Sequence, residues 1–227
     1  WYQTKVFYIS VVALLVTLIY VYIKIRERKL TQEKKILEKI VEERTQEIVQ
    51  QKEEIIASIT YAKGLQDAIL PPLPKFKKIL PQSFILYKPK DIVSGDFYWF
   101  AEKNGVKIFA VVDCTGHGVP GAFMSMIGHN LLNQIVLEKG IVDPAEILNN
   151  LHKGIQEALR QGKNEIKTND GMDVSLITLN DAEKWIKWAG ANRPLVVVDA
   201  NGELTKYDGN KFPVGGAQLE TERVFTT

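Results

Sequence analysis

The chain has 227 residues, of which 45% are hydrophobic and 25% charged, a globular composition with room for one or two domains. Its formal net charge of +2 is too small to predict nucleic-acid binding. The single cysteine, Cys114, excludes an internal disulfide. Residue 1 is Trp rather than Met, and we expect the chain to be a fragment at both ends.

A transmembrane helix is predicted within residues 1–24. Residues 6–23 carry no charge, and as a helix these 18 residues span roughly 27 Å, close to the thickness of a bilayer core. Four basic residues follow within 24–29, which predicts a single-pass membrane protein whose C-terminal part is cytoplasmic. The alternatives are a buried core helix and a signal peptide, although the short apolar core and small-residue cleavage site of a signal peptide are missing.

Residues 25–70 are predicted to form a long polar helix with a coiled-coil seam. From Leu37 onward the seam positions alternate spacings of four and three residues, although Arg44 and Gln51 interrupt the apolar pattern. Such a stripe needs a partner, and a second copy is the simplest one, so we expect a homodimer through residues 30–70. The helix is either a passive stalk or a signalling helix that carries a conformational change from the membrane.

A second domain is predicted over residues 80–227, after a proline-rich link. Two strand-like runs flank Asn-Gly at 104–105, a strong hairpin signal. Helical patterns follow at 119–138 and from 143 to about 162. Four more strand-like runs come next, two of them joined by a second hairpin at 200–202. This order predicts an α+β fold with antiparallel sheets and argues against a parallel βαβ fold.

Two acidic residues are predicted to lie side by side at one end of the first hairpin. Asp96 precedes the first strand and Asp113 ends the second. Hairpin pairing places Asp96 opposite about residue 112, next to Asp113. Carboxylates this close repel each other unless a cation lies between them, and a hard ion such as Mg²⁺ or Mn²⁺ prefers carboxylate and carbonyl oxygens, including that of Cys114. The structural alternative is that Asp113 caps a helix and Asp96 only starts a strand.

The turn after Asp113 predicts phosphate chemistry. Gly116 and Gly118 allow the backbone to approach a metal, and the turn runs into a helix whose N-terminus favours an anion. Carboxylates, a divalent metal and a phosphate-binding helix end together indicate metal-activated water attacking a phosphoester. His117 lies in the same turn, where it either touches the substrate or has a structural role.

These motifs resemble a known family. "VSGDFYWF" and "VVDCTGHGVPGAFMSMIG" are similar to the two leading motifs of the metal-dependent Ser/Thr protein phosphatases (PPM family), in their stage II sporulation E branch. "ITYAKGLQDAILP" resembles the helix that enters the domain in membrane-anchored members, and "GANRPLVVV" and "FPVGG" resemble later stretches. The resemblance covers roughly residues 59–227.

The resemblance implies a fold, a metal site and a substrate. The fold is an αββα sandwich of antiparallel sheets flanked by helices, with two Mn²⁺ or Mg²⁺ ions between the sheets. Asp96 and Asp113 are the implied metal ligands and catalytic residues, together with the backbone carbonyl of Cys114, and His117 and Gly118 are the expected substrate contacts. The implied substrate is a phosphoserine or phosphothreonine protein, often an anti-sigma-factor antagonist, in bacterial signal transduction.

The sequence departs from the family pattern at its C-terminus. Further metal-binding Asp residues of the family do not appear after Val214, so we expect a C-terminally incomplete domain with the missing ligands after residue 227 and a sensor before residue 1. Asp170 and Asp173 are interpreted as a turn and a strand start. A non-catalytic signalling module of the same fold is the alternative function. A histidine kinase is disfavoured, because residues 27–80 contain no histidine.

Overall fold

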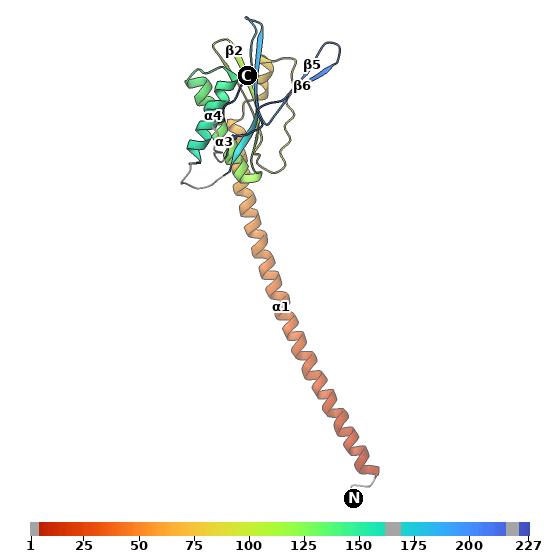
Figure 1. The fold of residues 1–227 in the computed structure, drawn as a ribbon. Helices are drawn as coiled ribbons and strands as arrows, with labels where there is room; N and C mark the ends of the chain where they lie inside the picture. The colour runs from red at the N-terminus through yellow and green to blue at the C-terminus, as the bar shows by residue number, and fades with distance from the viewer. Residues whose placement is uncertain (1–4, 162–168, 217–222) are drawn as a thin grey trace. The chain divides into compact units, whose positions relative to one another are not determined.

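The structure is a computed structural model that describes residues 5–161, 169–216 and 223–227 (Figure 1). The chain divides into two compact units, Trp1–Ala57 and Ser58–Thr227. We describe each unit by itself.

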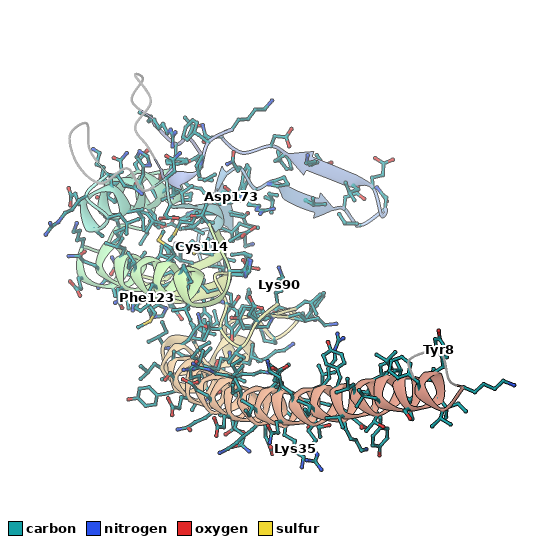
Figure 2. All side chains as sticks on the ribbon, turned by 90° about the horizontal axis from the view of Figure 1, so that it is seen from below. Tyr8, Lys35, Lys90, Cys114, Phe123 and Asp173 are labelled. Atoms are coloured by element: carbon teal, nitrogen blue, oxygen red, sulfur yellow. The ribbon has the colours of Figure 1, made fainter. Side chains whose placement is uncertain are left out.

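The first unit is formed by helix α1 (Lys5–Ile69), whose last turns belong to the second unit. The side chains of residues 8–57 project into solvent on all sides of the helix, as Tyr8 and Lys35 illustrate in Figure 2. This is the one helix in the described part of the chain that is long and apolar enough to cross a membrane, with a mean hydropathy of 2.5 in its best window. Of the span predicted over residues 1–24, the first four residues lie outside the described ones.

A short helix interrupts the proline-rich link that the sequence predicted. Helix α2 (Leu73–Ile79) has Pro74 in its first turn, where a missing N–H costs nothing. Its Phe76 is buried, with ring centroids 5.4 Å from Phe100 and 5.7 Å from Phe109. The link is therefore packed onto the domain rather than extended, because one aromatic side chain anchors it.

The second unit contains one main antiparallel sheet and one separate hairpin. The main sheet has the strand order β1-β2-β3-β4, and β7 pairs with β3. Its strands are β1 (Phe97–Lys103), β2 (Val106–Cys114), β3 (Gly171–Asn180), β4 (Trp185–Ala191) and β7 (Val214–Gly215). The separate hairpin consists of β5 (Leu195–Val198) and β6 (Leu204–Tyr207). The predicted α+β class with antiparallel sheets is confirmed.

The turn between β1 and β2 fixes the register of the first hairpin. Asn104 and Gly105 have φ angles of 53° and 77°, the left-handed conformation that a tight two-residue hairpin turn requires. The resulting register pairs Phe97 with Val112 and Lys103 with Val106. This register decides which residues meet at the far end of the hairpin.

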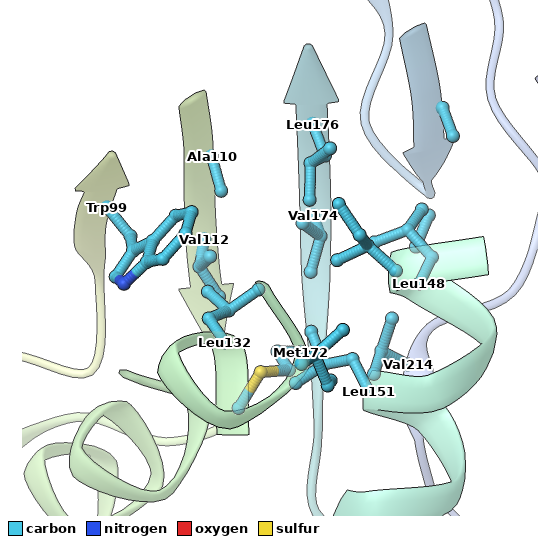
Figure 3. Packing of buried hydrophobic residues seen from close by; sticks show 14 of the residues in the cluster. Trp99, Ala110, Val112, Leu132, Leu148, Leu151, Met172, Val174, Leu176 and Val214 are labelled. Carbon is cyan, nitrogen blue, oxygen red and sulfur yellow. The ribbon is translucent and has the colours of Figure 1, made fainter. Parts of the chain in front are cut away.

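Helices cover one face of the main sheet. Helix α3 (Gly118–Leu132) continues into the π-helical segment η1 (Asn133–Glu138), where the sequence predicted one regular helix over 119–138. Helix α4 (Pro144–Ala158) follows, capped by the Asp143 carboxylate, which accepts the Ala145 and Glu146 N–H groups. Figure 3 shows the core between these layers: Trp99, Ala110, Val112, Val174, Leu176, Leu132, Leu148 and Leu151.

The described residues account for one helix-covered sheet of the predicted αββα sandwich. The opposite face of that sheet is open, since Val111 is 66% exposed in the middle of β2. Residues 76–88 run beside this face and, with strands of the main sheet, line an open cavity of about 790 Å³. The candidate site lies at one end of this cavity.

Candidate active site

The structure brings Asp96 and Asp113 together. Asp96 directly precedes β1, and the hairpin register, which pairs Phe97 with Val112, places Asp96 opposite Asp113. The two carboxyl groups lie close enough for the Asp113 carboxylate to change the acidity of Asp96. The sequence placed Asp96 one residue away, opposite about residue 112, so the predicted proximity is confirmed with a small error in register.

The proximity of these two carboxyl groups affects the pKa of Asp96 and of the neighbouring Cys114 thiol. Burial, followed by the proximity and charge of the Asp113 carboxylate, raises the pKa of Asp96, while the positive charge of Arg193 acts in the opposite direction. Burial, followed by the charges of Asp96 and Asp113, also raises the pKa of the Cys114 thiol far above its ordinary value. The thiol therefore stays protonated at neutral pH, which leaves the backbone carbonyl as the oxygen donor of Cys114.

A third carboxylate and a guanidinium complete the cluster. Asp173 on β3 is the cross-strand partner of Asp113. Arg193, just after β4, donates to the Asp113 carboxylate and lies 3.6 Å from that of Asp173. From the sequence, Asp173 is expected only as a strand start, and no role is predicted for Arg193. The alternation of Asp173 with Val174 along β3 was a usable signal, because it puts Asp173 on the face opposite the core.

Glycines allow the two backbone segments beside these acids to approach each other unusually closely. A Cβ atom on Gly95 would lie 2.7 Å from the Gly116 carbonyl oxygen and 3.5 Å from that of Cys114. A Cβ atom on Gly121 would meet the same Gly116 oxygen at 2.7 Å. Only glycine fits at these two positions, and the close approach holds the loop before Asp96 against the turn after Asp113.

The predicted substrate contacts lie in that turn. His117 is the N-terminal capping position of α3, is exposed, and pairs through Nδ1 with the Asp91 carboxylate at 2.8 Å. Gly118 has a φ angle of 65° and begins the helix. Asp113 belongs to β2 and does not cap α3, so the structural alternative for this residue is wrong. Asp91 is a neighbour that the sequence analysis missed.

A buried glutamine joins the end of α1 to the site. Gln66, 1% exposed, donates through Nε2 to the Ser94 carbonyl at 2.6 Å and to Ser125 Oγ at 2.9 Å. Its Oε1 accepts the Ser94 N–H at 3.0 Å. The loop that carries Asp96 is thus bonded to α1, and Gln66 of α1 is also bonded to Ser125 of α3.

Comparison with known proteins identifies the family. A family model described as Stage II sporulation protein E (SpoIIE) matches residues 103–225, slightly more than half of the chain. The chain belongs to the SpoIIE family. The matched range includes Asp113, Asp173 and Arg193, while Asp96 lies just before it. No curated protein sequence matches the chain.

Two solved structures are similar to this chain. The SiaA-PP2C domain of Pseudomonas aeruginosa is 32% identical with a TM-score of 0.64, over 72% of this chain and 64% of that one. The PP2C phosphatase domain of SpoIIE from Bacillus subtilis, solved with a fragment of its regulatory domain, is 22% identical with a TM-score of 0.44, over 59% of this chain and 36% of that one. The chain spans less than two thirds of either structure. The fold is that of a PP2C-type phosphatase domain.

The donor set of this SpoIIE-family site fits a hard divalent cation in part. Asp96, Asp113 and the Cys114 carbonyl could supply oxygen ligands, and a cation between the two carboxylates would relieve their crowding. Among the described residues, no group of three or more His, Cys, Asp or Glu side chains is arranged to hold a metal. The described part of the site thus offers the carboxylates of Asp96 and Asp113 and backbone oxygens, while the third carboxylate, Asp173, lies beside Arg193.

Proposed function

We propose that the chain is a protein phosphatase that hydrolyses phosphoserine or phosphothreonine with the help of Mn²⁺ or Mg²⁺. The observation that carries this proposal is the pair of Asp96 and Asp113, which face each other at the end of a hairpin in a SpoIIE-family fold. A cation between the two carboxylates would offset their repulsion, and the family's phosphatase fold supplies the reaction class.

Asp96, Asp113 and the Cys114 carbonyl are the residues that would hold the metal, with two ions expected in a complete domain. When bound, a divalent metal lowers the pKa of a water molecule and neutralises charge on a phosphoryl group. The chain itself contributes the N-terminus of α3, whose free N–H groups favour an anion beside the acids. His117, held by Asp91, and Gly118 lie at that helix end, where they can contact the substrate phosphate.

We also propose that the chain is anchored in the bacterial inner membrane by residues 6–23, with the phosphatase domain in the cytoplasm. The uncharged span and the basic residues after it support this orientation. The proposed domains are therefore a transmembrane helix at 1–24, a signalling helix at 25–70 and a phosphatase domain at 80–227. The proposed substrate is a cytoplasmic phosphoprotein regulator of the anti-sigma-factor antagonist type.

The signalling helix is proposed to form a homodimer through residues 30–70. The apolar seam residues Leu37, Val41 and Ile48 are 57–63% exposed, which is unfavourable for a single helix in water. Ile48→Glu is expected to shift the chain from dimer to monomer in light scattering of the detergent-solubilised protein. An Ile48→Glu variant that remains as dimeric as the unmodified chain would contradict the proposed coiled coil.

The second candidate function is a non-catalytic binding module of the same fold. It is favoured by one observation, that no group of three or more His, Cys, Asp or Glu side chains is arranged to hold a metal among the described residues. The two functions differ in turnover, which can be measured directly.

The test is phosphate release from a phosphoserine protein with and without Mn²⁺. The proposal predicts Mn²⁺-dependent release that Asp113→Asn reduces at least about a hundredfold, because the residue would hold the metal. Asp208→Asn is the matched control, since it removes the same charge from an exposed ion pair with Lys206 and is expected to leave release unchanged. Absence of release at every metal concentration would favour the binding module.

A further inference from the structure

Arg193 is presented to the acidic cluster by a turn that is held in place on several sides. The preceding residue, Asn192, has a φ angle of 54° and donates its N–H to the Asn210 carbonyl at 2.8 Å. Its side-chain amide donates to Asp173 at 2.9 Å, and its backbone forms a bridge with Val174. The turn that carries Arg193 is therefore tied both to β3 and to the segment that precedes β7.

The guanidinium group is shared by two carboxylates that face each other across the sheet. Asp113 and Asp173 are directly opposed on β2 and β3, and like charges in that position destabilise a sheet. Arg193 donates to Asp113 and lies 3.6 Å from Asp173, so one positive charge offsets the repulsion of both. Its side chain is 46% exposed, so it can move without a large loss of packing.

The same carboxylate oxygen cannot serve both a guanidinium and a metal at full strength. Asp113 is the proposed metal ligand, and its Oδ2 accepts from Arg193. We propose that Arg193 is a resident counter-ion that competes with the divalent metal for Asp113, and that Asp173 retains the guanidinium beside the site when the metal binds. This inference rests on the proposed function, because it takes Asp113 as a metal ligand.

The effect of Arg193 on the affinity for the metal has an expected direction and size. A partly exposed pair of single charges corresponds to a factor of up to about five in an equilibrium constant. A divalent ion feels the charge of Arg193 twice as strongly, so removal of that charge is expected to tighten metal binding by a factor of about 5 to 25. Removal of Asp173 acts in the opposite direction, because it takes away a nearby negative charge and leaves Arg193 with Asp113 alone.

The experiment is titration of the detergent-solubilised 227-residue chain with Mn²⁺ by calorimetry. Arg193→Gln is expected to bind Mn²⁺ about 5 to 25 times more tightly than the unmodified chain, and Arg193→Lys to stay within about threefold, since it keeps the charge. Asp173→Asn is expected to bind Mn²⁺ more weakly than the unmodified chain. The loss of affinity that Asp173→Asn causes is expected to be smaller in the Arg193→Gln background. Lys206→Gln removes one positive charge from the exposed β6 strand and is the matched control, with unchanged affinity expected.

A second measurement keeps the inference testable if calorimetry is limited by protein stability. In EDTA, Arg193→Gln is expected to melt at a lower temperature than the unmodified chain, because Asp113 and Asp173 then face each other without a cation. Mn²⁺ is expected to raise the melting temperature of Arg193→Gln more than that of the unmodified chain. A smaller rise overturns the inference even where an affinity cannot be measured.

The outcomes separate this inference from the proposed function. Equal or weaker Mn²⁺ binding by Arg193→Gln, with clear binding by the unmodified chain, overturns the role of Arg193 and leaves the metal site intact. Binding by Arg193→Gln alone supports the inference strongly. Absence of binding in both proteins, at Mn²⁺ concentrations that raise neither melting temperature, overturns the metal site itself and the inference with it.

Discussion

Gln66 is predicted to be the residue whose loss most directly loosens the loop that carries Asp96. Gln66→Leu keeps the approximate volume of the side chain but removes three hydrogen bonds from a residue that is 1% exposed. The Ser94 N–H and carbonyl groups then lose the partner that Gln66 provides, while Ser125 still donates to the Ala122 carbonyl. Each buried group left without a partner costs about 1–3 kcal/mol, so we expect a loss of about 2–5 kcal/mol in the free energy of unfolding.

The assay is urea denaturation of the detergent-solubilised chain, followed by tryptophan fluorescence, because Trp99 is buried in the same unit. Gln50→Leu is the matched control on the same helix, since Gln50 is exposed and its side-chain amide donates to Glu54 on the helix surface. A change below about 0.5 kcal/mol is expected. A destabilisation of Gln66→Leu as small as that of the control would refute the reasoning, because it would mean that water or a rearranged loop satisfies Ser94.

Two further predictions follow from single residues. Gly95→Ala is expected to destabilise the domain by about 1–3 kcal/mol and to weaken Mn²⁺ binding, because its Cβ would lie 2.7 Å from the Gly116 carbonyl oxygen. Gly64→Ala is the control in the same denaturation assay. It is expected to stabilise the chain slightly, because the space around Gly64 is open. Burial and then nearby positive charges lower the pKa of His152, whose Nδ1 accepts the Gly215 N–H, so its stabilising contribution is complete above about pH 6.5 and is lost as the pH falls below that value. Between pH 7.5 and 5, the free energy of unfolding should fall by about 1 kcal/mol more in the unmodified chain than in His152→Gln. Parallel pH dependences of the two proteins would contradict this account.

The hairpins and the proximity of the first two acids could be predicted because they depend on local sequence. Asn-Gly at 104–105 dictates a tight turn, and the register of a two-residue hairpin then fixes which residues meet near Asp96 and Asp113. The acidity and charge of that pair follow from elementary electrostatics. No knowledge of the rest of the chain was needed for this part of the site.

The contributions of Asp173 and Arg193 could not be predicted in the same way. They reach Asp113 through the pairing of β2 with β3, which are separated by two helices, and through a turn after β4. Strand order over such distances depends on how the helices pack, and periodicity does not report it. Helix α2 was missed because consecutive prolines signal a link, whereas the burial of Phe76 decides the local structure.

The most direct test of the central claim is to locate manganese in crystals of the protein grown or soaked with Mn²⁺. An anomalous-scattering map identifies the metal without reference to activity. The account predicts a manganese peak bonded to the carboxylates of both Asp96 and Asp113, with Arg193 displaced from Asp113. A map with bound manganese elsewhere and none at these two carboxylates would contradict it.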